Sequence, residues 1–166
     1  CSGILFNHES PLRGNEFVTK KISSYFANYI KSKKQSAPLL LGNLDAKRDW
    51  GYAPEYVLGM WKMLQHPKPD DYVLATGKTH SVRDFCTAVA NAIDIQIEWN
   101  GSNLAEVGID GKTGNVIVQI DKSLYRPAEV DLLIGNAEKA KNTLNWQPIK
   151  TMNEIAAEMV YFSLEH

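Results

Sequence analysis

The chain alternates short apolar runs with clusters of polar residues. The first run, Ile4 to Phe6, is followed by the polar sequence NHESPLRG, and apolar residues then recur at helical spacing over positions 17–30. An apolar run bounded by turn-forming residues is typical of a buried strand, and spacing of three and four residues is typical of an amphipathic helix. Ligands of open α/β sheets bind beyond the carboxyl ends of the strands, so this loop is the first candidate site. The alternative is an ordinary solvated connection.

The same alternation continues to the end of the chain. Further strands are predicted at positions 38–41, 72–75, 95–99 and 116–120, and further helices at 54–65, 82–93, 136–144 and 151–164. Ser81 with Asp84, and Thr151 with Glu154, have the spacing of a capping box, which marks a helix start. A dinucleotide-binding fingerprint lies between a strand and the helix that follows it. The glycines between positions 100 and 114 do not have this position, so they are not such a fingerprint. They predict a hairpin before the strand 116–120.

Helical spacing also predicts which side chains are buried. In the helix 54–65 the apolar positions Val57, Met60, Trp61 and Leu64 predict the buried face. In the helix 82–93 the pattern places Cys86 inside as a small apolar residue. We expect one hydrophobic core and no second one.

Composition excludes several classes of function. The 166 residues carry 18 basic and 19 acidic side chains, so no overall field favours nucleic acid or an anionic membrane. No uninterrupted apolar run has the length of a membrane span, and no signal peptide is visible. The two cysteines have neither metal-ligand spacing nor a disulfide framework. The cysteine pattern fits a reducing compartment and gives no metal site.

The start of the chain suggests that it belongs to something longer. The sequence has no initiator Met, and Cys1 to Phe6 reads as the inside of a strand. A strand of the parallel type is stable only when neighbouring strands pair with it. We therefore expect these residues to be the C-terminal part of a longer protein.

Three polar clusters carry the candidate chemistry. Each supplies one arginine beside a predicted strand: Arg13, Arg48 and Arg126. The guanidinium group is a planar fork of donors that suits phosphates. Three such groups, with Lys21, would suit a ligand that carries two phosphates. The alternative is that each arginine makes a structural ion pair, as Arg48 could near Asp49 and Arg126 could with Glu129.

The clusters together resemble a known family. Seven sequence motifs occur in a fixed order from about Gly3 to the end of the chain: FNHESP, FVTKK, LGN-x-D-x-x-RDWG, MWxMLQ, ATG, YRPAEV and LNWQP. They are similar in order and spacing to the GDP-mannose 4,6-dehydratases of the extended short-chain dehydrogenase/reductase superfamily. RDW recurs across the superfamily, whereas FNHESP and MWxMLQ are more particular to this family. The resemblance implies an α/β fold: the C-terminal part of an NAD(P)-binding Rossmann-type protein, with the last sheet strands and a small helix-rich substrate-binding domain.

The resemblance also implies an activity. The family converts GDP-mannose to GDP-4-keto-6-deoxymannose and water, through NADP-dependent oxidation, elimination and reduction, on the route to GDP-fucose. It implies that residues 1–166 belong to the substrate-binding portion and that the cofactor-binding half precedes them. The partners implied are GDP-mannose and further copies of the same chain, as a dimer or tetramer. The alternatives are another sugar-nucleotide epimerase or dehydratase of the superfamily, and a non-catalytic nucleotide-sugar-binding module.

Residue roles follow from the matched motifs. By resemblance, the cofactor NADP would contact His8 and Arg13, and GDP-mannose would contact Asn7, Lys21, Gly42, Asn43, Arg48, Arg126 and Glu129. Within that set, Arg48 would bind the diphosphate, and Arg126 with Glu129 would hold the nucleoside end. The chain departs from the family at Leu12, where many members have a further arginine.

No catalytic residue is assigned. The family's GxxGxxG fingerprint, its catalytic Thr and Glu, and its Tyr-x-x-x-Lys pair all belong upstream of the FNHES strand. The chain contains one Tyr-x-x-x-Lys sequence, from Tyr29 to Lys33, but it lies in the helix after that strand, with Tyr29 on the apolar face. Without a nicotinamide site beside it, this pair is not expected to be catalytic. We expect residues 1–166 alone to be inactive.

Overall fold

The computed structural model describes residues 1–125 and 132–166 as a mixed α/β structure. Its strands are β1 (Ser2–Leu5), β2 (His8–Glu9), β3 (Leu39–Leu41), β4 (Lys47–Arg48), β5 (Gly51–Tyr52), β6 (Asp71–Leu74), β7 (His80–Ser81), β8 (Ile97–Asn100), β9 (Val107–Asp110) and β10 (Val116–Ile120). Its helices are α1 (Val18–Lys31), α2 (Ala53–Gln65), α3 (Val82–Asn91), α4 (Glu138–Leu144) and α5 (Met152–Glu165), with the short 3₁₀ helices η1 (Asn103–Ala105) and η2 (Lys122–Leu124). The order of predicted strands and helices is therefore confirmed.

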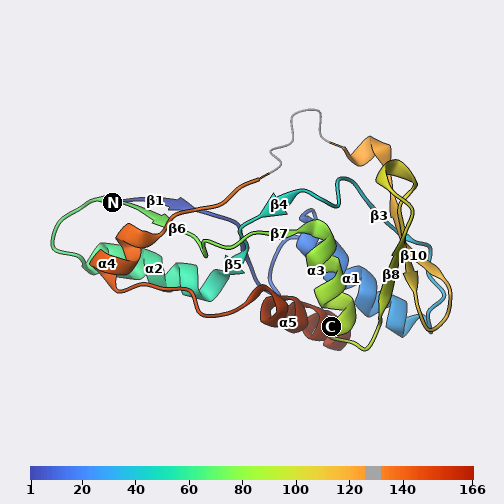
Figure 1. Ribbon diagram of the computed structural model, residues 1–166. Coiled ribbons are helices and arrows are strands. Elements are labelled where there is room, and N and C mark those ends of the chain that lie inside the picture. The colour runs from blue at the N-terminus through green and yellow to red at the C-terminus, as the bar shows by residue number, and fades with distance from the viewer. Residues whose placement is uncertain (126–131) are drawn as a thin grey trace.

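One end of the molecule contains the opening strand. There β1 pairs in parallel with β6, and α2 and α4 lie beside the two strands (Figure 1). The apolar side chains between them form a small buried cluster: Tyr56, Met63, Tyr72, Leu74, Ala140, Leu144 and Trp146. The opening strand is thus of the parallel type that the sequence predicted.

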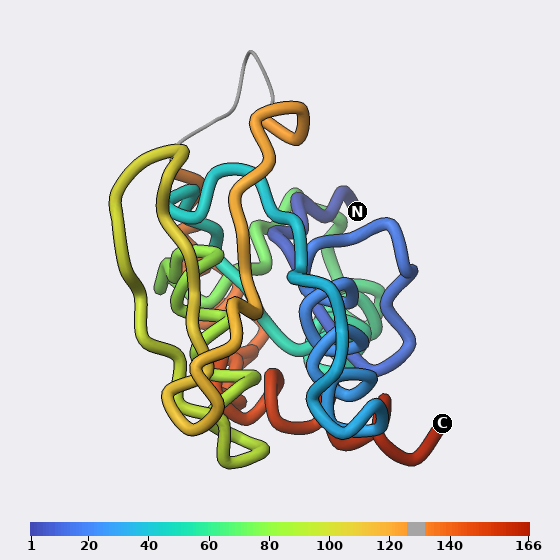
Figure 2. The backbone as a smooth tube through the Cα atoms, turned by 90° about the vertical axis from the view of Figure 1, so that its right-hand side faces the viewer, coloured from blue at the N-terminus to red at the C-terminus, as the bar shows by residue number. Residues whose placement is uncertain are grey.

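The other end is larger. It combines the sheet β3-β10-β9-β8 with the three helices α1, α3 and α5, which pack on one another (Figures 1 and 2). In that sheet β3 is parallel to β10, while β10, β9 and β8 are antiparallel. The glycine-containing segment before β10 therefore forms the predicted hairpin. The main hydrophobic core lies between the helices and the sheet, and Cys86 is buried there as expected.

Two short ladders join these ends. Strand β2 pairs in parallel with β5, and β4 pairs antiparallel with β7. The backbone N–H of Gly51 also donates to the carbonyl of Asn7 at 2.8 Å. The polar segments after β1 and around β4 are therefore held between the two ends of the molecule.

Both predicted capping boxes are present. The hydroxyl of Ser81 accepts from the backbone N–H of Asp84, and Thr151 does the same for Glu154. Each acidic side chain returns a hydrogen bond to the backbone N–H of its cap residue, which satisfies donors that a helix start otherwise leaves open. Asn136 also accepts from the N–H of Glu138 at 2.9 Å, at the beginning of α4.

Two expectations about burial were wrong. In α2 the buried residues are Tyr56, Gly59 and Met63. Of the predicted face, Met60 is half-buried against the smaller cluster, whereas Val57, Trp61 and Leu64 are 60%, 57% and 73% exposed. This helix is apolar on more than one face, so helical spacing alone could not select the face that packs against β6. The described residues also form two buried clusters rather than one core, because α2 and α4 pack around β6 and not on the larger sheet.

Across residues 1–125 and 132–166, no helix combines the length and apolar character needed to cross a bilayer.

Candidate functional site

A cleft of about 530 Å³ brings together six of the predicted site residues. It is lined by parts of β2, α1, β3 and β4, by the loops that follow β1 and β3, and by η2. The predicted residues on its walls are Asn7, Arg13, Lys21, Gly42, Asn43 and Arg48. Residues from the first two polar clusters of the sequence, about 35 positions apart, therefore share one cavity.

Three cations line the cleft from different segments. Arg13 belongs to the loop after β2, Lys21 to the first turns of α1, and Arg48 to β4. The Arg13 guanidinium lies over the ring of Phe17, with 3.5 Å between its central carbon and the ring centroid. Arg48 donates from Nη1 to the backbone carbonyl of Lys47 at 2.8 Å. Glu9 and Glu16 also line the cleft, so its walls carry three basic and two acidic side chains. The basic ones come from separate segments and could contact an anionic ligand together.

A buried acid lies beside Arg13. Glu9 is buried, and its Oε2 accepts a hydrogen bond of 2.6 Å from the Thr19 hydroxyl, while the Nε of Arg13 lies 3.2 Å from the same oxygen. Burial raises the pKa of Glu9, and the Thr19 bond and the charges of Arg13 and His8 only partly oppose that shift. Glu9 therefore positions both the start of α1 and the side chain of Arg13.

His8 lies at a second hollow, of about 370 Å³, beyond the carboxyl end of β1. Asn7 and Arg13 line this hollow as well as the larger cleft, so the two are neighbours. The His8 ring stacks on Tyr56, with 4.9 Å between centroids, and its Nδ1 is 2.8 Å from the carbonyl of Phe6. A carbonyl only accepts, so Nδ1 is the donor in this bond, which fixes the orientation of the ring.

The turn after β3 forms another wall. Gly42 faces the backbone of Leu124, and a Cβ at this glycine would lie 2.6 Å from the Leu124 carbonyl oxygen. Glycine therefore lets the end of β3 approach η2. The side chain of Asn43 is already used within the turn, because its Oδ1 accepts from the N–H of Asp45 at 2.9 Å.

Asp49 has a role that the sequence did not predict. Its buried carboxylate accepts hydrogen bonds from the backbone N–H groups of Thr76, Gly77 and Gly135 and from the Thr76 hydroxyl, at 2.6–3.2 Å. These bonds tie the segment after β4 to the turn after β6 and to the segment before α4. Asp49 therefore fixes the position of β4, on which Arg48 lies.

The Tyr-x-x-x-Lys sequence lies away from the cleft. Tyr29 is fully buried, and its hydroxyl donates to the carboxylate of Asp110 at 3.2 Å. Lys33 follows the end of α1 with a φ of 54°. The expectation that Tyr29 belongs to the buried face is confirmed.

Two predicted residues, Arg126 and Glu129, lie outside the described residues. Among the residues that are described, no group of three or more His, Cys, Asp or Glu side chains could hold a metal ion.

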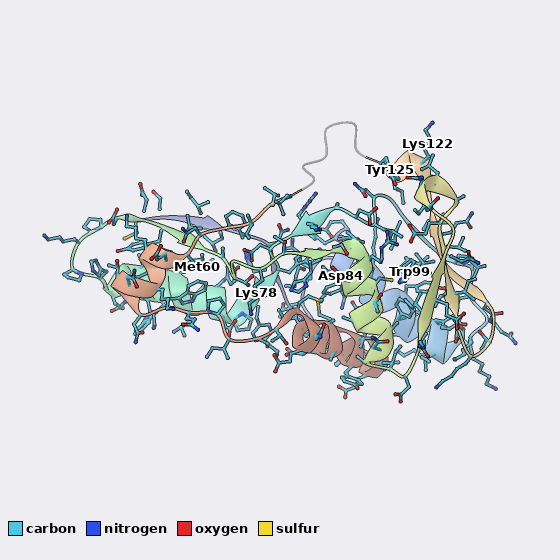
Figure 3. The ribbon with its side chains drawn as sticks, viewed as in Figure 1. Met60, Lys78, Asp84, Trp99, Lys122 and Tyr125 are labelled. Atoms are coloured by element: carbon cyan, nitrogen blue, oxygen red, sulfur yellow. The ribbon has the colours of Figure 1, made fainter. Side chains whose placement is uncertain are left out.

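Sequence reasoning missed an apolar part of the cleft. Leu40, Leu124 and Tyr125 line it, and their side chains are 47%, 43% and 37% exposed. Figure 3 shows Tyr125 at the end of η2, where the chain leaves the larger sheet. An aromatic residue directly before Arg126 was the only available signal for this part of the site.

Comparison with known proteins identifies relatives along the whole chain. The family model described as GDP-mannose 4,6 dehydratase matches residues 1–159. The GDP-mannose 4,6 dehydratases of Dictyostelium discoideum, Drosophila melanogaster and Homo sapiens are 51%, 51% and 49% identical to it. These alignments cover 100%, 99% and 99% of this chain but 46%, 41% and 44% of the relatives. The chain thus spans less than half the length of these relatives.

Solved structures share the fold. The structure of RMD from Pseudomonas aeruginosa complexed with NADPH matches with a TM-score of 0.75 and 18% identity, over 98% of this chain and 47% of that one. The UDP-glucose 4-epimerase from Bifidobacterium longum, in complex with NAD⁺ and UDP, matches with a TM-score of 0.72 and 16% identity, over 98% of this chain and 47% of that one. At these identities the likeness concerns the fold alone.

Proposed function

This chain belongs to the GDP-mannose 4,6-dehydratase family, and from that membership we propose that it supplies the GDP-sugar-binding part of a GDP-mannose 4,6-dehydratase. The enzyme would convert GDP-mannose to GDP-4-keto-6-deoxymannose and water. Over the aligned region, the two relatives with this name from Dictyostelium discoideum and Drosophila melanogaster are each 51% identical to the chain. Because the chain spans less than half of their length, the activity is proposed for the full-length enzyme.

The observation that carries the proposal is the cleft with Arg13, Lys21 and Arg48 on its walls. A sugar nucleotide has two phosphates, and cations from separate segments can contact both at once. We assign Lys21 and Arg48 to the diphosphate, with Asn7 beside them. The backbone of Gly42 and Asn43 is assigned to the nucleoside, together with Arg126 and Glu129.

We assign the cofactor to the second hollow, at His8 and Arg13. The hollow is large enough for part of a dinucleotide and lies beyond a parallel strand, as such sites do. Its Arg13 provides a cation for a phosphate, and His8 has a ring fixed by Tyr56 and by the Phe6 carbonyl. NADP would accept a hydride from the sugar and return it. Since Asn7 and Arg13 line both cavities, they would keep the cofactor and the sugar nucleotide adjacent.

Further features of the full-length enzyme belong to the same proposal. The groups that catalyse the chemistry would lie outside residues 1–166, and this chain would combine a substrate-binding domain with the last strands of the dinucleotide-binding sheet. The enzyme would be a cytoplasmic homo-oligomer. The alternative function is that of an epimerase or dehydratase that uses another nucleotide. It is considered because the structures with the same fold include a UDP-glucose 4-epimerase.

Competition between nucleotides separates these two functions. Guanine has an exocyclic amine and a ring N–H as hydrogen-bond donors. A site with acceptors for these two donors would leave the acceptors unpaired when it binds a pyrimidine. We expect GDP to displace a labelled GDP-sugar from the full-length enzyme at least about tenfold better than UDP, the factor that corresponds to 1.4 kcal/mol. Equal displacement by GDP, UDP and dTDP would contradict the GDP-mannose assignment.

A further inference from the structure

We propose that Tyr56 is the positioning residue for His8, and that Gly51 gives the Tyr56 ring the room to reach it. The inference rests on the proposed function, in which His8 contacts NADP. It assigns a role to the start of α2 and to Trp146 of the LNWQP motif, for which the family resemblance gave none.

The fully buried Tyr56 ring meets two other aromatic rings. It stacks on His8, with 4.9 Å between centroids and 20° between planes, and Trp146 meets it edge to face at 5.5 Å and 88°. The indole N–H of Trp146 donates to the carbonyl of Glu55 at 2.7 Å, so this third ring is fixed to the same helix. The three rings therefore form a continuous aromatic contact from the smaller buried cluster to β2.

Gly51 makes this contact possible. In the short ladder of β2 and β5, His8 pairs with Gly51, and α2 begins directly after β5 (Figure 1). The Tyr56 ring lies against that ladder: a Cβ at Gly51 would lie 2.6 Å from the Tyr56 hydroxyl oxygen and closer still to the ring edge. Non-bonded atoms do not approach so closely, so a side chain at position 51 would push the ring away from its place beside His8.

Two contacts together restrain the imidazole of His8. The hydrogen bond from Nδ1 to the Phe6 carbonyl fixes one edge of the ring, and stacking on Tyr56 fixes its face. His8 lines the hollow assigned to the cofactor, whereas Tyr56 is not among the described residues on its walls. Tyr56 therefore acts on the cofactor through His8 and not by touching it. A side chain that is already held in place does not have to be ordered when a ligand binds, which improves affinity.

The ring of Tyr56, rather than its hydroxyl, carries this role. Within residues 1–125 and 132–166 the buried hydroxyl has no hydrogen-bond partner. Burial raises the pKa of Tyr56, and the charges of Asp49 and Glu55 act in the same direction, so the phenol is neutral. The contact with His8 needs a flat ring, and phenylalanine also supplies one.

The alternative is that Tyr56 is only a member of the smaller hydrophobic cluster. Tyr72 provides the matched comparison, because it belongs to the same cluster, is also buried and also has a hydroxyl without a described partner. It differs in its neighbours, since the histidine ring beside it is that of His66, at 6.3 Å. A loss of core packing would affect variants of both tyrosines, whereas positioning of His8 concerns Tyr56 alone.

Titration of the full-length enzyme with NADPH, followed by the fluorescence of the nucleotide, tests the inference. Tyr56→Leu should weaken NADPH binding about fivefold, which lies within the range that an aromatic pair contributes, and should leave GDP affinity unchanged. Tyr56→Phe should retain the affinity for NADPH. Tyr72→Leu should lose stability but keep the affinity for NADPH. Gly51→Ala should reproduce the fivefold loss, and it carries the same test if Tyr56→Leu does not fold.

A double variant separates an action through His8 from a general effect. His8→Ala should itself weaken NADPH binding, and adding Tyr56→Leu to it should cause no further loss, because the side chain that Tyr56 positions is already gone.

Three outcomes would overturn the inference while leaving the proposed function intact. They are normal NADPH affinity in both Tyr56→Leu and Gly51→Ala, an equal loss of affinity in Tyr72→Leu, and a further fivefold loss when Tyr56→Leu is added to His8→Ala. A failure of the unmodified enzyme to bind NADPH would instead reject the cofactor assignment of the proposed function, and the inference with it.

Discussion

Arg48 is the residue through which the nucleotide-binding assignment is tested most directly. It lines the cleft, and the Asp49 carboxylate next to it fixes the local backbone through four hydrogen bonds. The fixed backbone holds the base of the Arg48 side chain at the wall of the cleft. Its contribution to binding should therefore be close to that of a well-formed charged hydrogen bond.

Replacing Arg48 should weaken GDP-mannose binding. We expect Arg48→Ala in the full-length enzyme to lose about 1.5–3 kcal/mol of binding free energy, the usual range for hydrogen bonds to charged groups. Arg48→Lys should restore only part of it, because a point charge does not replace the planar fork. Calorimetric titration measures both values, and Lys47→Ala serves as the control because Lys47 is an exposed neighbouring cation outside the cleft. Unchanged affinity in Arg48→Ala would mean that the arginine is structural.

Glu9 is a second residue with a measurable consequence. Burial raises its pKa, so the folded chain binds a proton at Glu9 more readily than the unfolded chain does. The stability that Glu9 contributes is therefore fully present at low pH and declines as the pH rises through its raised pKa. Glutamine reproduces the neutral side chain at every pH.

The free energy of unfolding of the Glu9→Gln variant should therefore increase relative to that of the unmodified chain as the pH rises from about 4 to 8. Urea denaturation across this range measures the trend. Glu154→Gln is an informative comparison, because the hydrogen bonds from Thr151 lower the pKa of Glu154. That variant should show the opposite trend, with its loss of stability present at neutral pH and shrinking as the pH falls. Parallel trends in the two variants would be inconsistent with this account of Glu9.

At the scale of elements, one buried acid attaches the β9–β10 hairpin to α1. Asp110, at the end of β9, is buried and accepts from Tyr29 at 3.2 Å and from the Lys34 Nζ at 2.8 Å. Burial alone would raise the pKa of Asp110, but the bonds from Lys34, the Lys112 backbone and Tyr29 lower it to about 2. Because the folded pKa is depressed, the contribution of Asp110 to stability is present above its unfolded value and is lost as the pH falls toward 2.

Asp110→Asn should therefore be destabilising at neutral pH. The difference in free energy of unfolding between this variant and the unmodified chain should shrink as the pH falls from about 4 toward 2. Chemical denaturation followed by tryptophan fluorescence measures this, since Trp99 lies in the neighbouring strand β8. Asp71→Asn, at an exposed position of β6, should change little at any pH. A pH-independent loss in Asp110→Asn would point to packing rather than charge.

At the scale of the whole molecule, the outer face of α2 is an exposed apolar surface. Val57, Trp61 and Leu64 are exposed together on this helix, and Ile4 of β1 at the same end of the molecule is exposed as well. The three α2 residues, at helical spacing, form an exposed apolar strip, and such a strip is a candidate site of association. Strand β1 itself pairs with β6 within the chain, so the prediction rests on this apolar face of α2.

The purified 166-residue chain should therefore bind a hydrophobic dye or self-associate. Replacing both Trp61 and Leu64 with Gln should reduce dye binding and shift sedimentation toward the monomer, with little loss of stability because both side chains are exposed. Ile149→Gln, an exposed apolar position outside α2, is the control. A monomer with a sharp, cooperative melt and no dye binding would contradict this prediction.

The sequence by itself determined the features that depend on near neighbours. The order of strands and helices, the capping boxes at Ser81 and Thr151, and the burial of Cys86 all follow from residues within a few positions of one another. The motif order also determined the family, and six of the residues that it selected line one cleft. Local chemistry is sufficient for such features, since a cap or a helical stripe has the same physics in any fold.

Only the tertiary structure decided which surfaces meet. The sequence could not select the inner face of α2, because Tyr56 and Met63 are no more apolar than Trp61 and Leu64, and the choice depends on contact with β6. The burial of Glu9 beside Thr19, the four bonds to Asp49 and the exposure of Tyr125 in the cleft likewise depend on segments distant in the chain. Burial is a property of what packs against a residue, and packing partners far along the chain leave no local signal in its sequence.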